Sequence, residues 1–294
     1  MRPPRELLER FPGLPAGCQW FPLRQTGFSG ATVWRGEFEG EPLFALKCHP
    51  SDYPLERQHL IEKWWIRAGH LPFVPELLGS HDHWELTAWK LGKPCHHFEP
   101  NDPKLDAACA AILQLHDVWK PFGKSGPIPG IARRIELLQS WNPTSETGLR
   151  AEAMRVVFRY LPEVMESLAP WRNRRFPLQP VLADVHAEHV LFTGNAVTGI
   201  VDFGAMKIDH VAVDAARYLG DTCDGHGEAF QRGCELFARH LGEETCPPEL
   251  VELLDRSGTL AAIAYWLKRD EHSPEAAARL ARQIERWNAL IPCV

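Results

Sequence analysis

The pattern of apolar residues changes once along this 294-residue chain, and this change constrains the fold more than any single motif. Residues 20–48 alternate between β-branched or aromatic residues and polar ones around glycine turns, which is typical of short strands. After about residue 100, apolar residues recur at helical spacing, as in 105–119 and through most of 209–294. This order predicts an α+β chain with a first domain at 1–91 and a helical second domain at 92–294.

The same spacing predicts the individual elements. In the first domain, one helix is expected at 55–69, where Gly69 would end it, and residues 74–92 return to short strands. Two further strand-like runs are expected to bracket the motif VLADVHAEHVLF at residues 181–192. The second domain is expected to contain helices at 105–119, 133–141, 151–171, 213–220, 228–242, 248–256, 259–269 and 274–290.

The overall charge and the apolar segments limit the classes of partner. A formal net charge of −6 gives no attraction to nucleic acids or to anionic membrane surfaces, so neither is expected as a partner. No apolar stretch is long enough for a membrane span, and residues 1–13 lack the apolar core of a signal peptide. The eight cysteines form no C-x-x-C pair, which argues against a zinc or redox motif. We therefore expect a cytoplasmic protein.

Two aspartates follow apolar runs at points where strands are expected to end. Asp184 follows the run PVL after one alanine, and Asp202 follows GIV and precedes Phe203 and Gly204. Carboxylates on either side of a short hairpin can point into one cleft, where they suit a divalent metal and proton acceptance, as phosphoryl transfer requires. Aspartate is also common in turns and caps, so either residue alone has a purely structural interpretation.

Lys47 lies inside the apolar run FALKC, two strands after the glycine turn TGFSGATVW. Backbone N–H groups of the turn between Gly27 and Gly30 could cover phosphate groups. Taken singly, the lysine could instead be an edge residue whose side chain reaches solvent, and the turn could be a plain hairpin. The order of the parts is more specific than any one of them: glycine turn, strand lysine, helix, hinge, Asp184, then Asp202 with Phe203 and Gly204.

This order closely resembles the aminoglycoside phosphotransferase and choline kinase superfamily of kinase-like enzymes, and the resemblance covers nearly the whole chain. It is strongest in LADVHAEHVLFTGNAVTGIVDFGAMKIDHVAVDAARYLG, residues 182–220. That stretch is similar to the family's H-G-D-x-x-x-x-N loop, its I-D-F/W-G metal motif and its D-x-A helix start. QLH at 114–116 resembles the L-x-x-L-H end of the first large-lobe helix. The resemblance implies a protein-kinase-like two-lobed fold, with a five-stranded antiparallel N-lobe, one N-lobe helix, a helical C-lobe and ATP between the lobes.

The resemblance also implies roles for individual residues. Lys47 would orient the α- and β-phosphates of ATP, Asp184 would accept or orient the proton of the acceptor hydroxyl, and Asp202 would chelate Mg²⁺. Asp214 would be a structural acid that braces the catalytic loop. The other ATP contacts are expected from the glycine turn and from the hinge, namely Gly27, Ser29, Gly30, Thr87, Ala88, Trp89 and Lys90.

The chain departs from the family pattern at three places. Leu182 and Ala183 replace the histidine and glycine before the catalytic aspartate, and these two are mainly loop scaffold. His189 replaces the asparagine that supplies an oxygen to magnesium. An imidazole could still bind the metal, with Mn²⁺ then favoured, or it could hydrogen-bond Asp184 instead. Gln58 stands where a glutamate is expected to pair with Lys47; its acidic neighbours Glu56 and Glu62 lie out of register and could simply face solvent.

Three functions remain open from the sequence. The first is ATP-dependent phosphorylation of a hydroxyl on a small molecule, as in aminoglycoside, choline or homoserine kinases. The second is a pseudokinase-like protein that binds nucleotide without transferring phosphate, which the changes at Gln58 and His189 could produce. The third is a metal hydrolase using Asp184, His186, His189 and Asp202.

The acceptor is less constrained by the sequence. Four acidic residues follow the metal motif, and they could form a pocket for a cationic amine or a solvated acidic loop. These residues are Asp209, Asp221, Asp224 and Glu228.

Overall fold

The computed structural model describes the chain except for a few short segments, which are residues 1, 24–29, 143–146, 270–272 and 292–294. The chain divides into two compact units, each formed by two stretches of sequence. The first unit contains residues 1–95 and 188–205, and the second contains residues 96–187 and 206–294. The predicted boundary near residue 91 remains a prediction; the first compact unit also includes the later stretch around Asp202.

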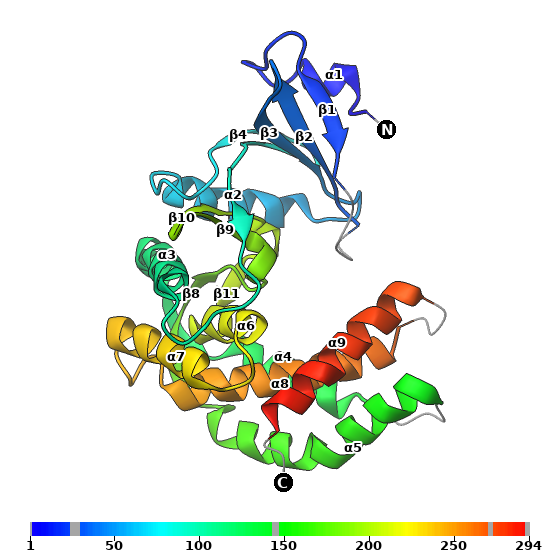
Figure 1. Cartoon of the computed structure of the whole chain (residues 1–294), viewed down its shortest axis with the longest axis vertical. Helices are drawn as coiled ribbons and strands as arrows, with labels where there is room; N and C mark the ends of the chain where they lie inside the picture. Colours follow the sequence, from blue (N-terminus) through cyan, green and yellow to red (C-terminus); the bar gives the residue numbers. More distant parts are fainter. Residues whose placement is uncertain (1, 24–29, 143–146, 270–272, 292–294) are drawn as a thin grey trace. The chain divides into compact units, whose positions relative to one another are not determined.

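A five-stranded antiparallel sheet forms most of the first unit, in the order β1-β2-β3-β5-β4 (Figure 1). Its strands are β1 (Gln19–Pro22), β2 (Thr32–Phe38), β3 (Glu41–Cys48), β4 (Leu77–His81) and β5 (Trp84–Ala88). The sheet and the helix α2 (Leu55–Ala68) agree with the elements predicted for this part of the chain, and the short helix α1 (Arg5–Leu8) precedes them. Because β3 lies between β2 and β5, the interpretation of Lys47 as an edge residue is wrong.

The two faces of this sheet bury different residues, as the two-residue period of a strand requires. Leu46 of β3 and Leu86 of β5 belong to a buried cluster on one face. The other members of that cluster are Leu7, Phe11, Trp20 and Trp34. The residues that alternate with the two leucines, Lys47 and Glu85, therefore point to the opposite face.

A smaller sheet completes the first unit. It has the order β10-β9-β6, with β6 (Lys93–Pro94), β9 (Val190–Thr193) and β10 (Ala196–Ile200). The β9–β10 hairpin leads into a one-turn 3-10 helix (Phe203–Ala205), and the Phe203 ring stacks on Trp65 of α2 at 4.7 Å. This buried aromatic pair fixes the position of the chain that follows Asp202.

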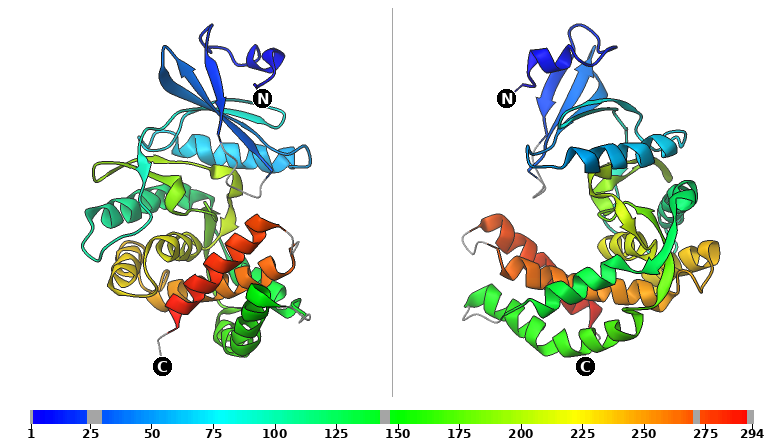
Figure 2. Two further views of the ribbon diagram at one scale, coloured as in Figure 1. Left: turned by 45° about the vertical axis from the view of Figure 1, so that its right-hand side comes forward. Right: turned by 180° about the vertical axis from the view of Figure 1, so that it is seen from behind.

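Helices dominate the second unit, which Figure 2 shows from two further sides. They are α3 (Pro103–Trp119), α4 (Pro129–Gln139), α5 (Gly148–Leu168), α6 (Ala212–Thr222), α7 (Glu228–Leu241), α8 (Pro248–Leu267) and α9 (Pro274–Leu290). A three-stranded antiparallel sheet accompanies them, with the order β11-β8-β7. Its strands are β7 (Lys124–Pro127), β8 (Arg175–Val181) and β11 (Lys207–Asp209).

One helix prediction was wrong in its boundaries. The sequence predicted two helices, at 248–256 and 259–269, on either side of Ser257 and Gly258, but α8 runs through both. Ser257 and Thr259 direct their hydroxyl groups to carbonyl oxygens one turn earlier, at 2.5 and 3.1 Å, so the polar residues are satisfied inside the helix. Among the described residues, no helix combines the length and the apolar character needed to cross a bilayer.

Candidate active site

Lys47 and Asp202 meet in the first unit although they are 155 residues apart in the sequence. Lys47 Nζ lies 2.7 Å from Asp202 Oδ1, and the lysine side chain is only 18% exposed. Burial lowers the pKa of Lys47, but the adjacent Asp202 carboxylate outweighs this effect and the pKa is raised. The lysine is therefore a fixed cation on the face of the sheet opposite the apolar cluster.

Asp202 occupies an unusual backbone position directly after β10. Its φ is +63°, in the left-handed region that aspartate tolerates better than most residues. A side chain at Gly204 would place its Cβ 3.0 Å from Lys47 Nζ, so glycine at this position leaves room for the ion pair. Burial raises the pKa of Asp202, but Lys47 and then His189 reverse the effect, and the pKa is lowered. The carboxylate is therefore ionised.

His189 approaches the other oxygen of the same carboxylate. Its Nε2 lies 3.8 Å from Asp202 Oδ2, and its carbonyl oxygen accepts a hydrogen bond from Val201 N–H at 2.9 Å. The two side chains thus offer one carboxylate oxygen and one imidazole nitrogen side by side, which fits a divalent ion whose other ligands are phosphate and water oxygens. Within the described ranges, no group of three or more His, Cys, Asp or Glu side chains is placed to hold a metal, so the predicted alternative of a hydrolase metal site gains no support.

The acid near Lys47 comes from a strand rather than from the helix. Gln58 of α2 is buried, and its Oε1 has no hydrogen-bond partner among the described residues, whereas Glu56 is exposed. Glu85 of β5 is paired with Lys47 of β3 in the sheet register and is buried beside His49, whose Nε2 lies 3.0 Å from Glu85 Oε1. Glu85 also contributes to raising the pKa of Lys47, after the larger effects of burial and Asp202. The sequence analysis missed Glu85; the available signal was a charged residue alternating with buried ones in WELTA.

Tyr53 connects this group to the turn after Asp202. Its ring stacks on His49 at 4.3 Å, and its hydroxyl donates a hydrogen bond to the Gly204 carbonyl at 3.1 Å. Because burial raises the pKa of Tyr53, the hydroxyl keeps its proton and remains a donor.

In the second unit, Asp184 lies in the loop that follows β8. The Arg217 side chain contacts Asp184 Oδ1 through Nε at 3.2 Å and through Nη2 at 3.0 Å. Asp184 is 50% exposed and Arg217 is 45% exposed, so both groups reach solvent. The sequence analysis did not identify Arg217, because its position in VDAARYLG looks like an ordinary helix-surface residue.

Helix α6 holds this loop along one of its faces. Asp214, Arg217 and Asp221 are spaced at i, i+3 and i+7 and therefore share a face. Asp214 accepts hydrogen bonds from the backbone N–H groups of Leu182 at 2.8 Å and Ala183 at 2.7 Å, and Asp221 accepts one from Ala187 N–H at 2.9 Å. The prediction that Asp214 braces the loop before Asp184 is thus confirmed, whereas the catalytic role of that loop remains a prediction.

The pKa values of Asp214 and Asp221, the two acids on this face of α6, shift in opposite directions. Burial raises the pKa of Asp214 to about 7, although the two N–H groups oppose the shift. Burial also raises the pKa of Asp221, but the Ala187 N–H group and then Arg282 outweigh it, and the pKa is lowered. Asp221 is therefore a charged member of the cluster beside Asp184, with Arg282 Nη2 at 3.2 Å.

The residues predicted to contact ATP in the glycine turn and the hinge are only partly accounted for. Gly27 and Ser29 lie outside the described residues, whereas Gly30 is exposed and has a φ of +68°, which favours glycine. Of the hinge, Thr87 and Ala88 end β5, and Trp89 and Lys90 follow it.

Two hinge N–H groups already have partners within the first unit. Ala88 donates its backbone N–H to the Glu76 oxygen at 2.9 Å, and Trp89 donates to the Leu43 oxygen at 2.8 Å. Neither group is available to adenine while these bonds persist, so an adenine contact by Thr87, Ala88, Trp89 or Lys90 remains a prediction.

The acidic residues after the metal motif do not act as one set. Asp209 is fully buried, accepts a hydrogen bond from Gly130 N–H at 3.1 Å and pairs with Arg133, so it belongs to the interior. Asp224 is highly exposed beside His97, which agrees with a solvated acidic residue. Of the four acids, Asp221 is the one beside the Asp184 loop.

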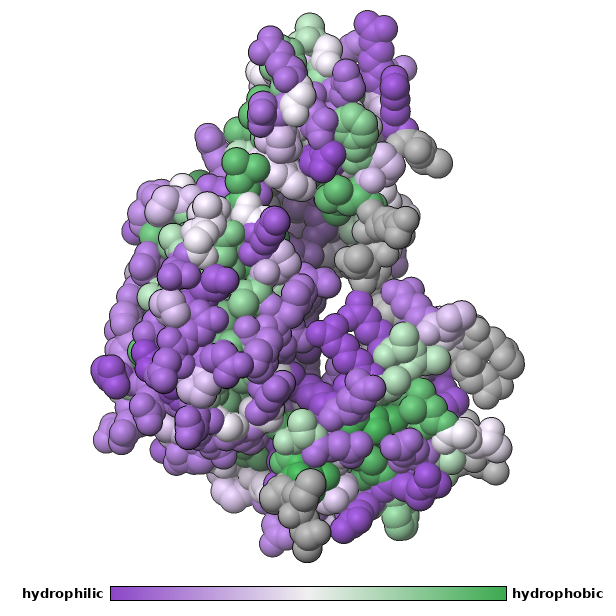
Figure 3. Space-filling model, in the orientation of Figure 1, coloured by the Kyte–Doolittle hydropathy of each residue, from purple (hydrophilic) through white to green (hydrophobic). Residues whose placement is uncertain are grey.

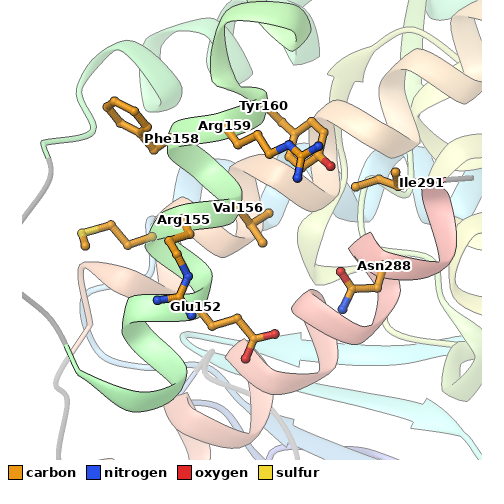
Figure 4. Close-up of a pocket in the computed structure, with 9 residues that line it drawn as sticks. Glu152, Arg155, Val156, Phe158, Arg159, Tyr160, Asn288 and Ile291 are labelled. Carbon is orange, nitrogen blue, oxygen red and sulfur yellow. The ribbon is translucent and has the colours of Figure 1, made fainter. Parts of the chain in front are cut away.

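A separate groove lies between α5 and α9 in the second unit (Figure 4). Its walls include Phe158, Tyr160 and Ile291 together with Glu152 and Asn288. The face drawn in Figure 3 is mostly hydrophilic, with hydrophobic residues gathered over these lower helices. None of the residues predicted to act on nucleotide, metal or acceptor lines this groove.

Comparison with known proteins assigns the family. Residues 23–235, well over half of the chain, match the sequence pattern of the phosphotransferase enzyme family. The chain belongs to the phosphotransferase enzyme family. Membership of this family supports a kinase-type phosphotransferase.

Individual relatives are more distant. A homoserine kinase from Beijerinckia indica is 29% identical over 163 residues, which make up 51% of this chain and 47% of that protein, so the match spans about half the length of the curated relative. The ADP-bound aminoglycoside phosphotransferase APH(2'')-Ib has 12% identity and a TM-score of 0.57, covering 96% of this chain and 97% of that one. A choline/ethanolamine kinase family protein from Mesorhizobium loti has 18% identity and a TM-score of 0.58, covering 97% and 98%. These structures confirm the predicted kinase-like α+β fold.

Proposed function

We propose that this chain transfers the γ-phosphoryl group of ATP to a hydroxyl group of a small molecule. The observation that carries this proposal is the ion pair of Lys47 and Asp202, in which a largely shielded lysine on β3 lies 2.7 Å from a partly exposed carboxylate at the turn after β10. A lysine for phosphate oxygens and an ionised aspartate for a divalent metal are the two groups that phosphoryl transfer requires of the nucleotide site. Family membership supports the same reaction class.

The nucleotide would be held by residues of the first unit. Lys47 would exchange part of its contact with Asp202 for phosphate oxygens, and the turn around Gly30 would cover them. Asp202 and His189 would hold a divalent ion, Mg²⁺ or Mn²⁺, which when bound neutralises charge on the phosphates. Glu85 would keep a negative charge near Lys47 when the phosphates compete for it.

The acceptor hydroxyl would be oriented by Asp184, the solvent-accessible acid of the α6-braced loop. The hydroxyl oxygen attacks the γ-phosphorus, the bond from that phosphorus to the bridging oxygen breaks, and ADP leaves. Asp184 takes the proton that the hydroxyl loses. The names of the relatives suggest three acceptor classes: aminoglycosides, choline or ethanolamine, and homoserine.

A second candidate is a protein that binds nucleotide without transferring phosphate. The observation that favours it is Gln58, because a buried amide replaces the helix acid expected beside Lys47. Against it stands the loop that carries Asp184. Its backbone is held by three hydrogen bonds to Asp214 and Asp221, and a protein that only binds nucleotide would not need this loop to be held in place.

Calorimetry and turnover together test the proposal. ATP is titrated into the protein with Mg²⁺, with Mn²⁺ and with EDTA, and ADP release is then measured against a panel of small alcohols. We expect metal-dependent binding and acceptor-dependent ADP release, with Asp184→Asn abolishing release and leaving ATP affinity unchanged. Asp117→Asn, a similarly exposed acid of α3, is the matched control and should keep activity. Metal-dependent ATP binding with no ADP release for any acceptor would support the second candidate, and no ATP binding would refute both.

A further inference from the structure

The guanidinium group beside Asp184 is not needed to hold the loop. Asp214 and Asp221 already fix its backbone at both ends, through the N–H groups of Leu182, Ala183 and Ala187. Arg217, between these two acids on the same face of α6, instead contacts the side chain of Asp184. Its contribution is therefore a positive charge placed against the carboxylate that the proposed reaction uses.

The contact of Arg217 with Asp184 competes with the acceptor hydroxyl for the same carboxylate oxygen. Both Nε and Nη2 of Arg217 lie on Oδ1 of Asp184, at 3.2 and 3.0 Å, so they occupy lone pairs that an acceptor hydroxyl would use. An acceptor that brings its own anionic group can bind the guanidinium and release this oxygen. An acceptor that brings only cations cannot, because it would add repulsion to Arg217 without replacing Asp184.

The surrounding charges favour a ligand with charges of both signs. Arg282 of α9 pairs with Asp221, so two arginines alternate with Asp184 and Asp221 in one cluster, next to His186. The charges of these four residues balance, so the four together offer no net negative charge to a polycation. A planar guanidinium matches the two oxygens of a carboxylate in a fork, which an ammonium group does not.

We propose that the acceptor is a small hydroxylated carboxylic acid, including hydroxylated amino acids, and that Arg217 binds its carboxylate. This inference rests on the proposed function. Because Arg217 Nη2 and Asp184 Oδ1 are 3.0 Å apart, the carboxylate and the reacting hydroxyl of the acceptor are separated by only a few bonds.

Matched acceptor pairs test this inference through ADP release. L-homoserine is compared with 3-aminopropan-1-ol, L-serine with ethanolamine, and glycerate with ethylene glycol, so that each pair differs by the carboxylate. Choline and kanamycin complete the panel. We expect kcat/KM to be about 100-fold higher for the acid of the best pair, because a site built for a polar group rejects the analogue that lacks it.

Variants of Arg217 separate substrate binding from a purely structural role. Arg217→Met should raise the KM of the acid by at least about tenfold, leave the KM of ATP unchanged and have little effect on the matched alcohol, and Arg217→Lys should be intermediate. Arg232→Met is the control, because Arg232 pairs with Asp106 through two contacts and with similar exposure elsewhere in the second unit. It should change neither KM.

Each other outcome has a definite meaning. Phosphoryl transfer to the hydroxyl groups of the amino alcohols, choline or kanamycin, but not to those of the acids, would overturn the inference and leave the proposed function intact. An equal loss of kcat for acids and alcohols in Arg217→Met would show that Arg217 only positions Asp184, which also overturns it. No ADP release with any acceptor would refute the proposed function, and the inference would fall with it.

Discussion

Glu85 on β5 lies directly opposite Lys47 on β3 in the antiparallel register, on the face of the sheet away from the apolar cluster. The helix position at which the family pattern places an acid for this lysine holds Gln58, which is buried and uncharged. The negative charge near the lysine therefore comes from a neighbouring strand. Because both strands belong to one sheet, this acid stays in register with Lys47 even if α2 moves.

The first prediction concerns this strand acid. Replacing Glu85 by glutamine should raise the KM of ATP by about tenfold, because Lys47 loses the second of its two nearby negative charges and is then held more tightly by Asp202, the metal-binding acid. Glu56→Gln, an exposed change on α2, should leave the KM unchanged and serves as the control. Steady-state kinetics and ATP calorimetry measure the effect, and equal ATP affinity in the two variants would contradict it.

The second prediction concerns the metal. His189→Asn replaces an imidazole nitrogen beside Asp202 Oδ2 by an amide oxygen, which magnesium prefers. The ratio of ATP affinity in Mn²⁺ to that in Mg²⁺ should fall by about tenfold in this variant. His70→Asn, on the surface after α2, is the matched control. An unchanged ratio would mean that His189 is not a metal ligand.

The third prediction concerns strain in the Asp184 loop. Ala183 has a φ of +66°, a conformation that costs an alanine about 1–2 kcal/mol and a glycine almost nothing. Ala183→Gly should therefore raise the free energy of unfolding by about 1 kcal/mol and the melting temperature by a few degrees. Ala187→Gly changes the same residue type in the same loop, where φ is not positive, and should destabilise instead. Calorimetric melting of both variants decides, and a lower melting temperature for Ala183→Gly would show that the conformation carries no strain.

Local patterns predicted most of the fold, because strand and helix periods depend on residues close in sequence. They identified the short strands of the first unit, α2 and most second-unit helices. The number of strands in the sheet and the association of Lys47, Asp184 and Asp202 with one reaction came from the family resemblance. Local patterns could not identify Glu85 or Arg217. Each acts through a partner far away in the sequence, and that partner becomes a neighbour only through strand register or helix packing. The break predicted inside α8 failed for a related reason, since Gly258 lies against Arg134 of α4, where an added Cβ would be 3.2 Å from Nη2, and this neighbour is distant in the sequence.

The last prediction concerns the buried histidine after β11. His210 is fully buried, and its Nδ1 accepts a hydrogen bond from Ala212 N–H at 3.2 Å, which requires the neutral ring. Burial lowers the pKa of His210 to about 4, although the neighbouring Asp209 opposes the shift. In the unfolded chain the pKa of a histidine is about 6.5, so between these values the unfolded state binds more protons than the folded state.

The free energy of unfolding should therefore fall as the pH decreases from 6.5, by about 1.4 kcal/mol per pH unit for this residue and by about 2 kcal/mol at pH 5. Asp214, whose pKa is raised to about 7, acts in the opposite direction over part of this range, so the wild-type curve alone does not isolate His210. His210→Asn does isolate it, because asparagine can accept the Ala212 N–H bond and cannot be protonated. Denaturant unfolding at several pH values should give a difference between wild type and variant that grows on acidification, whereas the exposed His59→Asn should give a constant difference. A constant difference for His210→Asn as well would mean that His210 keeps its ordinary pKa in the folded protein.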